Sequence, residues 1–188
     1  MVRYGMIIDL RSCIGCGACV AACDMENDTL WEEGKRRTEV PKLLFGTYPT
    51  VMAVFVPRLC MHCDNPPCVA VCPTGASYKT EDGVVLVNYD LCIGCKYCVV
   101  ACPYDARYVD EKKRRAVDKC TFCYENRVKQ GRLPACVETC VGHARIFGDL
   151  DDPSSEAGRL AMSGLARPLR PDLGTKPKVL YIPKVKFE

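Results

Sequence analysis

One short stretch decides the fold of this 188-residue chain: residues 92–103 read Cys92-Ile93-Gly94-Cys95-Lys96-Tyr97-Cys98-Val99-Val100-Ala101-Cys102-Pro103. Three cysteines stand two residues apart, a fourth follows after three residues, and a proline closes the stretch. Such close spacing brings three thiols together in one tight loop. The fourth cysteine lies about one helical turn further on and faces away from that loop. The stretch therefore predicts a loop of three thiols followed by a short helix.

All sixteen cysteines follow this pattern or a stretched version of it, and none is left over. Group one is Cys13, Cys16, Cys19 and Cys23; group two is Cys60, Cys63, Cys68 and Cys72; group three is Cys92, Cys95, Cys98 and Cys102; group four is Cys120, Cys123, Cys136 and Cys140. A disulfide framework is usual in short secreted chains, and the N-terminal residues show neither a secretory signal nor a twin-arginine pair. A four-cysteine zinc site fits the spacing of group four alone. Group three matches the C-x2-C-x2-C-x3-C-P run of bacterial ferredoxins, so we predict four 4Fe-4S clusters.

The ligands of each cluster are expected to come from two groups, three from one and the fourth cysteine of the other. Groups two and three pair because both end in Cys-Pro and because a short hairpin, residues 77–87, joins them. Groups one and four then pair by elimination. The predicted sets are Cys13, Cys16, Cys19 and Cys140 (cluster 1); Cys23, Cys120, Cys123 and Cys136 (cluster 2); Cys60, Cys63, Cys68 and Cys102 (cluster 3); and Cys72, Cys92, Cys95 and Cys98 (cluster 4).

The repeat of strand, cysteine loop and short helix predicts an α+β fold, a duplicated bacterial ferredoxin-like arrangement of two modules with two 4Fe-4S clusters each. The inner module comprises residues 51–103 and holds groups two and three. The outer module comprises residues 1–50 and 104–150 and holds groups one and four. The fourth cysteine of each group is expected to lie on a short helix, and short strands are expected before groups one and three.

The last part of the sequence, residues 151–188, contains no cysteine and is expected to form a short helix and an irregular, extended tail for subunit contact. Asp152-Pro153 predicts the N-cap and first position of a helix that ends near Gly164. Prolines then limit regular structure to one strand-like piece, residues 178–182. The sequence leaves two alternatives for the tail: it wraps its own domain, or it lies along another subunit.

Two charged or polar segments interrupt the cysteine pattern. Residues 24–50 form a polar insert without clean periodicity, which leads into a strand-like run at residues 50–56. Trp31 within the insert is expected to be a local packing anchor. The charged run at residues 111–115 is interpreted as a solvated hairpin tip, with docking to an acidic partner as the alternative. Nothing in the sequence interleaves aromatic and basic residues as a nucleic-acid surface would.

The two histidines lie close to cysteines, His62 within group two and His143 after group four. Sixteen cysteines already suffice for four clusters, so we expect neither histidine to be a ligand. Hydrogen bonding that tunes a cluster is the functional alternative for both.

The formal charge of +3 and the hydrophobic fraction of 48% both change meaning if the cysteines hold clusters. Sixteen thiolates together with four oxidised cores of charge +2 bring the net charge to about −5. Clusters would also occupy much of the interior, so the apoprotein is not expected to fold stably. The longest apolar run has six residues, Val51–Val56. A membrane-spanning helix needs about 20, so we do not expect the protein to cross a bilayer by itself.

Several segments resemble a known family beyond their spacing. They are Cys60-Met61-His62-Cys63-Asp64-Asn65-Pro66-Pro67-Cys68, Cys72-Pro73-Thr74-Gly75-Ala76, Ala101-Cys102-Pro103-Tyr104-Asp105-Ala106-Arg107-Tyr108, Lys119-Cys120-Thr121-Phe122-Cys123 and Pro134-Ala135-Cys136-Val137-Glu138-Thr139-Cys140. They resemble the four-cluster electron-transfer subunits of molybdopterin oxidoreductases. Phe147-Gly148-Asp149-Leu150-Asp151-Asp152-Pro153 points to the branch with polysulfide, thiosulfate and tetrathionate reductases. The resemblance implies the crossed ligand sets given above, although Val141 stands where relatives usually carry proline.

The resemblance also implies a function. The protein is expected to relay electrons and to carry no catalytic residue, since the active site lies on a large molybdopterin (molybdenum or tungsten) subunit. An integral membrane quinone-binding subunit is the second expected partner. The complex is expected at the cytoplasmic membrane, on the outer face through a partner's twin-arginine signal, with the cytoplasmic face as the alternative. A polyferredoxin-like carrier, an iron–sulfur subunit of a hydrogenase or formate dehydrogenase, and a zinc-rich module are the competing hypotheses.

Overall fold

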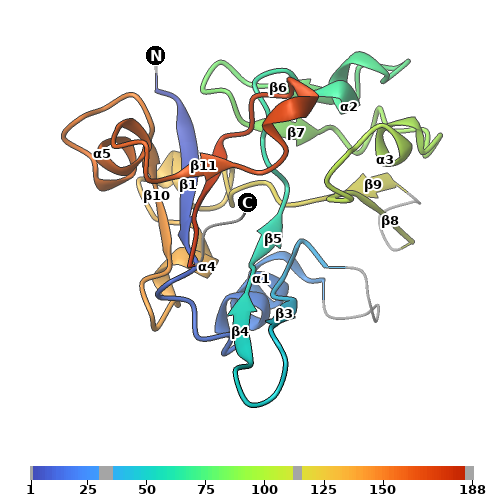
Figure 1. Ribbon diagram of the computed structural model, residues 1–188. Coiled ribbons are helices and arrows are strands. Elements are labelled where there is room, and N and C mark those ends of the chain that lie inside the picture. Colours follow the sequence, from blue (N-terminus) through green and yellow to red (C-terminus); the bar gives the residue numbers. More distant parts are fainter. Residues whose placement is uncertain (1, 30–35, 112–115, 185–188) are drawn as a thin grey trace.

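A four-stranded sheet joins the beginning and the end of the chain (Figure 1). The structure is a computed structural model that describes residues 2–29, 36–111 and 116–184. Strand order in the sheet is β10-β1-β12-β11. The strands are β1 (Tyr4–Asp9), β10 (Arg145–Asp149), β11 (Arg167–Pro168) and β12 (Val179–Ile182). β1 pairs antiparallel with β10 and parallel with β12, and β12 pairs antiparallel with β11.

The central position of β1 explains its apolar sequence. Met6, Ile7 and Ile8 are completely buried, because β1 has a strand on each side and packed side chains on both faces. The predicted strand at residues 178–182 is confirmed as β12. Of the two courses open for the tail, the described part therefore packs on its own chain and completes the sheet.

Four short helices carry the cysteine groups, and they lie in two pairs. They are α1 (Ala18–Asn27), α2 (Pro67–Ala70), α3 (Tyr97–Val100) and α4 (Ala135–Glu138). α1 contacts α4, whereas α2 contacts α3, and Figure 1 shows the second pair at the opposite end of the molecule from the first. The fold therefore brings group one beside group four and group two beside group three.

The helices are shorter than the sequence predicts, which corrects the expectation for three of the fourth cysteines. Cys23 lies within α1, but Cys72, Cys102 and Cys140 lie just beyond the ends of α2, α3 and α4. A proline follows Cys72 and Cys102, and the residue before a proline avoids the helical conformation. Group one lacks this proline, and α1 continues past Cys23. Group four lacks it as well, yet α4 ends before Cys140, so the proline accounts for the ends of α2 and α3 only.

Two antiparallel hairpins connect the groups. The predicted hairpin is confirmed as β6 (Ser77–Lys79) with β7 (Val85–Val87). A second hairpin, β8 (Tyr108–Asp110) with β9 (Ala116–Asp118), joins groups three and four. The charged run that was interpreted as its tip lies largely at residues 112–115, outside the described residues.

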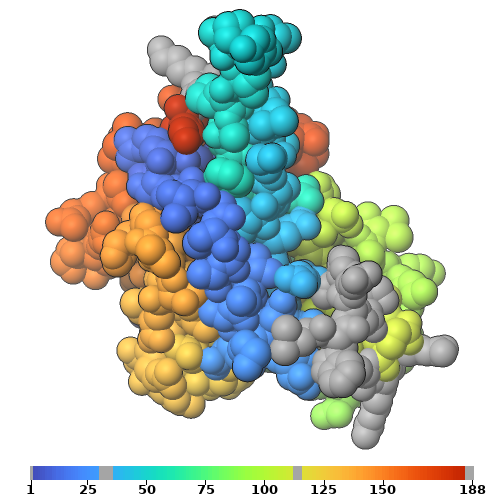
Figure 2. Space-filling model, turned by 90° about the horizontal axis from the view of Figure 1, so that it is seen from below, coloured from blue at the N-terminus to red at the C-terminus, as the bar shows by residue number. Residues whose placement is uncertain are grey.

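The polar insert contains more strand than expected. β2 (Thr38–Glu39) pairs with β5 (Arg58–Leu59), and β3 (Lys42–Phe45) pairs with β4 (Met52–Phe55), which confirms the strand-like run. The β3–β4 hairpin projects from the body of the molecule (Figure 2). Trp31 lies outside the described residues.

The C-terminal helix starts later than predicted. α5 (Glu156–Met162) has Ser155 as its N-cap, whose Oγ accepts the N–H of Gly158 at 2.9 Å. The carboxylate of Asp152, the predicted cap, accepts the N–H of Ser154 and closes a turn before the helix. Two single-turn 3-10 helices, at Val128–Gln130 and Pro171–Leu173, complete the elements. Across the residues that the structure describes, no helix has the length and apolar character needed to span a bilayer.

Candidate metal centres

Three of the four predicted cysteine sets each surround one cavity. The cavity of the cluster 1 set has about 360 Å³ of empty space including its part open to solvent, that of the cluster 4 set about 330 Å³, and that of the cluster 2 set about 300 Å³. Their cysteine linings are Cys13, Cys16, Cys19 and Cys140; Cys72, Cys92, Cys95 and Cys98; and Cys23, Cys120, Cys123 and Cys136. Each lining combines three cysteines of one group with one cysteine of its partner group.

The members of the fourth set, Cys60, Cys63, Cys68 and Cys102, act on one another electrostatically, which shows that they lie close together. Burial raises the pKa of Cys63 to about 12, and the neighbouring thiols of Cys60, Cys68 and Cys102 contribute to the rise. Burial likewise raises the pKa of Cys68, with contributions from Cys60 and Cys102. All sixteen sequence-predicted residues are therefore grouped by the fold in fours.

Hydrogen-bond donors point at several of the sulfur atoms. The backbone N–H of Ser77 donates to Cys72 Sγ at 3.4 Å, and that of Ala144 donates to Cys140 Sγ at 3.2 Å. The N–H of Phe122 donates to Cys120 Sγ at 3.4 Å. Donors of this kind stabilise thiolates, which are the form that binds metal.

The loops between the cysteines owe their shape to left-handed backbone positions. Gly15 has φ +71°, and a Cβ at this residue would lie 2.3 Å from the ring of Phe55. The second left-handed position in the loop of group one is Gly17, with φ +76°. The equivalent residue in the loop of group three is Lys96, with φ 66°. The loop conformation is therefore the same in both groups, and only the first position needs glycine for space.

Burial makes several of these thiols unreactive in the absence of metal. Burial raises the pKa of Cys120 to about 12 and that of Cys136 to about 11. At neutral pH both would be protonated thiols in an apolar interior, which is an inert state. A bound metal reverses this by stabilising the thiolate.

The cysteines stand around their cavities rather than converging on one point. Among residues 2–29, 36–111 and 116–184, no three His, Cys, Asp or Glu side chains are close enough together to hold a single metal ion.

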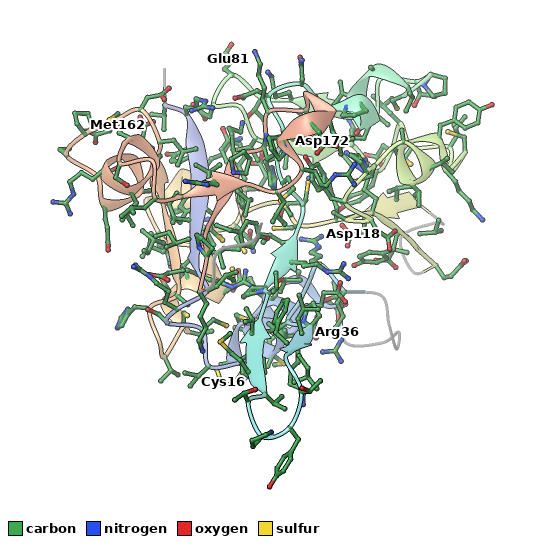
Figure 3. The ribbon with its side chains drawn as sticks, viewed as in Figure 1. Cys16, Arg36, Glu81, Asp118, Met162 and Asp172 are labelled. Atoms are coloured by element: carbon green, nitrogen blue, oxygen red, sulfur yellow. The ribbon has the colours of Figure 1, made fainter. Side chains whose placement is uncertain are left out.

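The four sets differ in exposure. Cys16 of the cluster 1 set and Cys95 of the cluster 4 set are exposed, whereas Cys60, Cys120 and most members of the other two sets are buried. Figure 3 shows Cys16 at the end of the molecule where β4 projects. Two sets are thus near the surface, and two are inside.

The histidines occupy different surroundings. His62 is completely buried, and its Nδ1 accepts the N–H of Val85 at 3.1 Å. Burial holds its pKa well below the usual range, so the ring is neutral. His143 is exposed.

Sequence reasoning missed three buried cations beside the cysteines, Arg107, Lys119 and Arg145. A signal was present: the two arginines each stand five positions after the last cysteine of a group, and Lys119 directly precedes Cys120. Arg107 Nη2 donates to Cys68 Sγ at 3.0 Å.

Comparison with known proteins gives the class of this protein. Two family profiles described as "4Fe-4S dicluster domain" match, one over residues 12–76 and one over residues 51–150. The two matches overlap and together span all four cysteine groups, so the protein belongs to the class of 4Fe-4S dicluster proteins.

Individual relatives narrow the class. The B subunit of tetrathionate reductase from Salmonella typhimurium is 48% identical over 184 residues, which are 96% of this chain and 72% of the relative. The B component of polysulfide reductase from Wolinella succinogenes is 45% identical over 96% of this chain and 94% of its own length. The B subunit of sulfite dehydrogenase from Allochromatium vinosum is 42% identical over 99% and 85%. The protein belongs to the family of iron–sulfur B subunits of oxidoreductase complexes, which transfer electrons while catalysis takes place on a partner subunit.

Proposed function

We propose that the sixteen cysteines hold four 4Fe-4S clusters, in the crossed sets predicted from the sequence, and that the protein relays single electrons through them. The observation that carries this proposal is the lining of the three cavities, each by the four cysteines of one predicted set. The N–H donors at Cys72, Cys120 and Cys140 fit the sulfur ligands of such clusters. The two modules, residues 51–103 and residues 1–50 with 104–150, would hold two clusters each.

The sets follow one another in the order 1, 2, 3, 4. Arg145 lines the cavities of sets 1 and 2, so these two sets are adjacent. The thiol of Cys60 in set 3 contributes to the raised pKa of Cys120 in set 2, so these two sets are also adjacent. Arg107 contacts Cys68 of set 3 and lines the cavity of set 4. Clusters bound in this row would supply one-electron redox chemistry, while the polypeptide fixes their spacing and excludes water from the middle two.

The exposed sets mark the two ends of the relay. Ile14 beside set 1 and Ile93 beside set 4 are 62% and 68% exposed. Exposed apolar side chains beside a redox site near the surface suit contact with another protein. Electrons would enter at one end and leave at the other.

The partners that fit these ends are a molybdopterin catalytic subunit, with molybdenum or tungsten, and a quinone-binding membrane subunit. The named relatives are all B components, which implies further subunits in each complex. Their names specify tetrathionate, polysulfide and sulfite, and this variety fits a subunit that carries electrons without touching the substrate. The complex would lie peripherally at the cytoplasmic membrane, on its outer face.

Metal and sulfide analysis of anaerobically purified protein tests the proposal. Four clusters require about sixteen iron and sixteen acid-labile sulfide per chain. Zinc without iron would refute it, and about eight iron would reduce it to two clusters. Co-purification of a larger, molybdenum- or tungsten-containing subunit would separate a complex subunit from a free polyferredoxin-like carrier.

A further inference from the structure

Three cationic side chains lie inside the molecule between the cysteine sets. They are Arg145, Lys119 and Arg107, and their exposed fractions are 3%, 1% and 3%. Burying a charge is costly unless an opposite charge compensates it. Within the described part of the chain, none of the three lies within ion-pair distance of a carboxylate. The compensating charge must therefore come from the cysteines and from what they hold.

Arg145 lies between sets 1 and 2. It lines both cavities, and the thiols that act on it most strongly are Cys136 of set 2 and Cys19 of set 1. Its Nη2 donates to Thr38 Oγ1 at 2.8 Å, whereas its Nε is buried and has no acceptor among the residues that the structure describes. The guanidinium thus keeps a free donor in the gap between two cysteine sets.

Arg107 has the same position between sets 3 and 4. Its Nη2 donates to Cys68 Sγ of set 3 and to Ser77 Oγ at 2.7 Å, and its side chain lines the cavity of set 4. Its Nε and Nη1 are buried and donate no hydrogen bond to any residue that the structure describes. Cys98 of set 4 is among the thiols that act on its charge.

The two arginines are equivalent positions of the internal repeat. Arg107 stands five residues after Cys102, and Arg145 stands five residues after Cys140. Each also donates to a side-chain hydroxyl. The duplication therefore places one guanidinium inside each pair of sets.

Lys119 occupies the remaining gap, between sets 2 and 3. Its Nζ donates to the carbonyl groups of Cys120, at 2.7 Å, and of Val85. The thiols of Cys60 and Cys68 in set 3 and of Cys120 in set 2 interact electrostatically with Lys119 and favour its charged form. Each of the three gaps along the row thus contains one cationic side chain.

We propose that Arg145, Lys119 and Arg107 raise the reduction potentials of the clusters on either side of each gap. Gain of one electron adds one negative charge to a cluster and its four thiolates, so a fixed positive charge nearby stabilises the reduced form more than the oxidised form. A cation in the gap between two clusters is close to both, so it acts on the reduction potential of both. This inference rests on the proposed function.

Charge-removing variants of the two arginines test it. Arg145→Gln and Arg107→Gln are purified anaerobically as holoprotein, their iron is counted, and their potentials are measured by redox titration with electron paramagnetic resonance. We expect full iron content and a fall of at least about tenfold in the reduction equilibrium constant, or about 59 mV for one electron, at two of the four sites. The two variants should affect different pairs of sites.

Two controls distinguish local charge from general effects. Arg132→Gln removes the same charge from an exposed position and should shift no potential. Arg145→Lys changes the shape of the side chain and keeps its charge, so it should shift the potentials by much less than Arg145→Gln. If Arg145→Gln does not assemble clusters, Arg107→Gln and Arg145→Lys still test the inference. A tenfold change in the reduction equilibrium constant of Arg145→Lys would contradict a charge effect, because lysine keeps the positive charge.

Three results would overturn the inference: unchanged potentials in fully loaded glutamine variants, an equal shift at all four sites, or a similar shift in Arg132→Gln. Each of these leaves the proposed function intact. Absence of iron from the unmodified protein would instead refute the proposed function itself.

Discussion

The imidazole of His62 stacks on the phenyl ring of Phe122, with ring centroids 3.7 Å apart and an angle of 19° between the planes. His62 lies between two cysteines of group two, and Phe122 lies between two cysteines of group four. Both side chains are buried, and both residues have positive φ. The stack therefore joins the cysteine loop of group two directly to the cysteine loop of group four.

Removal of this contact should loosen the junction. Phe122→Ala creates a cavity whose cost is about 3–5 kcal/mol, which corresponds to a fall of about 10 °C in the melting temperature of the holoprotein. Differential scanning calorimetry under anaerobic conditions measures it. Tyr48→Ala, at a side chain that is 92% exposed, is the control and should melt like the unmodified protein. Equal melting of both variants would show that the stack contributes nothing.

The ion pair of Arg37 with Asp118 should be a second point of high sensitivity. Asp118, labelled in Figure 3, is completely buried and accepts hydrogen bonds from Arg37 and from the hydroxyl groups of Tyr89 and Tyr108. Burial, followed by the carboxylate of Asp118, raises the pKa of both tyrosines, so they remain donors. Asp118→Ala leaves the guanidinium uncompensated, at a cost of about 3–5 kcal/mol.

The exposed pair of Lys129 with Glu125 supplies the control for that experiment. Glu125→Gln should leave the melting temperature of the holoprotein unchanged, because solvent screens an exposed ion pair. A melting temperature of Asp118→Ala within error of that of Glu125→Gln would contradict the structural role assigned to the buried network.

The crossed ligation can be tested by one substitution in α1. Cys23 lines the cavity of Cys120, Cys123 and Cys136, not that of the other group-one cysteines. Cys23→Ser should therefore disturb the cluster held by the three group-four cysteines and leave the cluster at Cys13, Cys16 and Cys19 intact. Redox titration followed by electron paramagnetic resonance reads both signals. Loss of the cluster at Cys13, Cys16 and Cys19 instead would refute the outer pairing.

Two neighbouring glycines form a matched pair. Both have positive φ, but a Cβ at Gly15 would collide with Phe55, whereas nothing lies within 4 Å of a Cβ at Gly17. Gly17→Ala should cost only the left-handed strain, about 1–2 kcal/mol. Gly15→Ala should cost clearly more and release iron faster on heating. Similar iron-release rates would mean that the aromatic ring moves aside at no cost.

Removal of the iron should unfold the protein. The interior would then contain protonated thiols around cavities instead of ligated metal. Circular dichroism after anaerobic chelation should show loss of the native spectrum, and addition of iron and sulfide should restore it. A cooperative thermal transition in the iron-free protein would argue that the sheet and side-chain core are sufficient for folding.

The sequence was enough to predict the β6–β7 hairpin, because a hairpin depends on a short stretch of sequence. The grouping of the sixteen thiols in crossed fours stays a prediction, because it depends on pairing between cysteine groups that lie far apart in the chain. The ends of the helices were less predictable. The helix is a single turn in three of the groups. A proline after Cys72 and after Cys102 accounts for the ends of α2 and α3, whereas α4 ends before Cys140 without one.

Other features that sequence reasoning missed depend on contacts between distant residues. A strand-like pattern at residues 178–182 says nothing of its partner, and only the fold shows that it pairs parallel with β1. Arg145 and Arg107 look like ordinary surface cations until the topology places them between cysteine sets. The stack of His62 on Phe122 joins residues from two groups in the same way.

The position of β1 has a consequence for the time course of folding. This strand comes first in the sequence, yet both of its partners, β10 and β12, come late. Contacts between distant segments form slowly, because a long loop must close first. Groups two and three need only the short β6–β7 hairpin to meet, whereas groups one and four meet across most of the sequence. The inner pair of clusters is therefore expected to be acquired before the outer pair, and an interrupted maturation should accumulate a half-loaded intermediate.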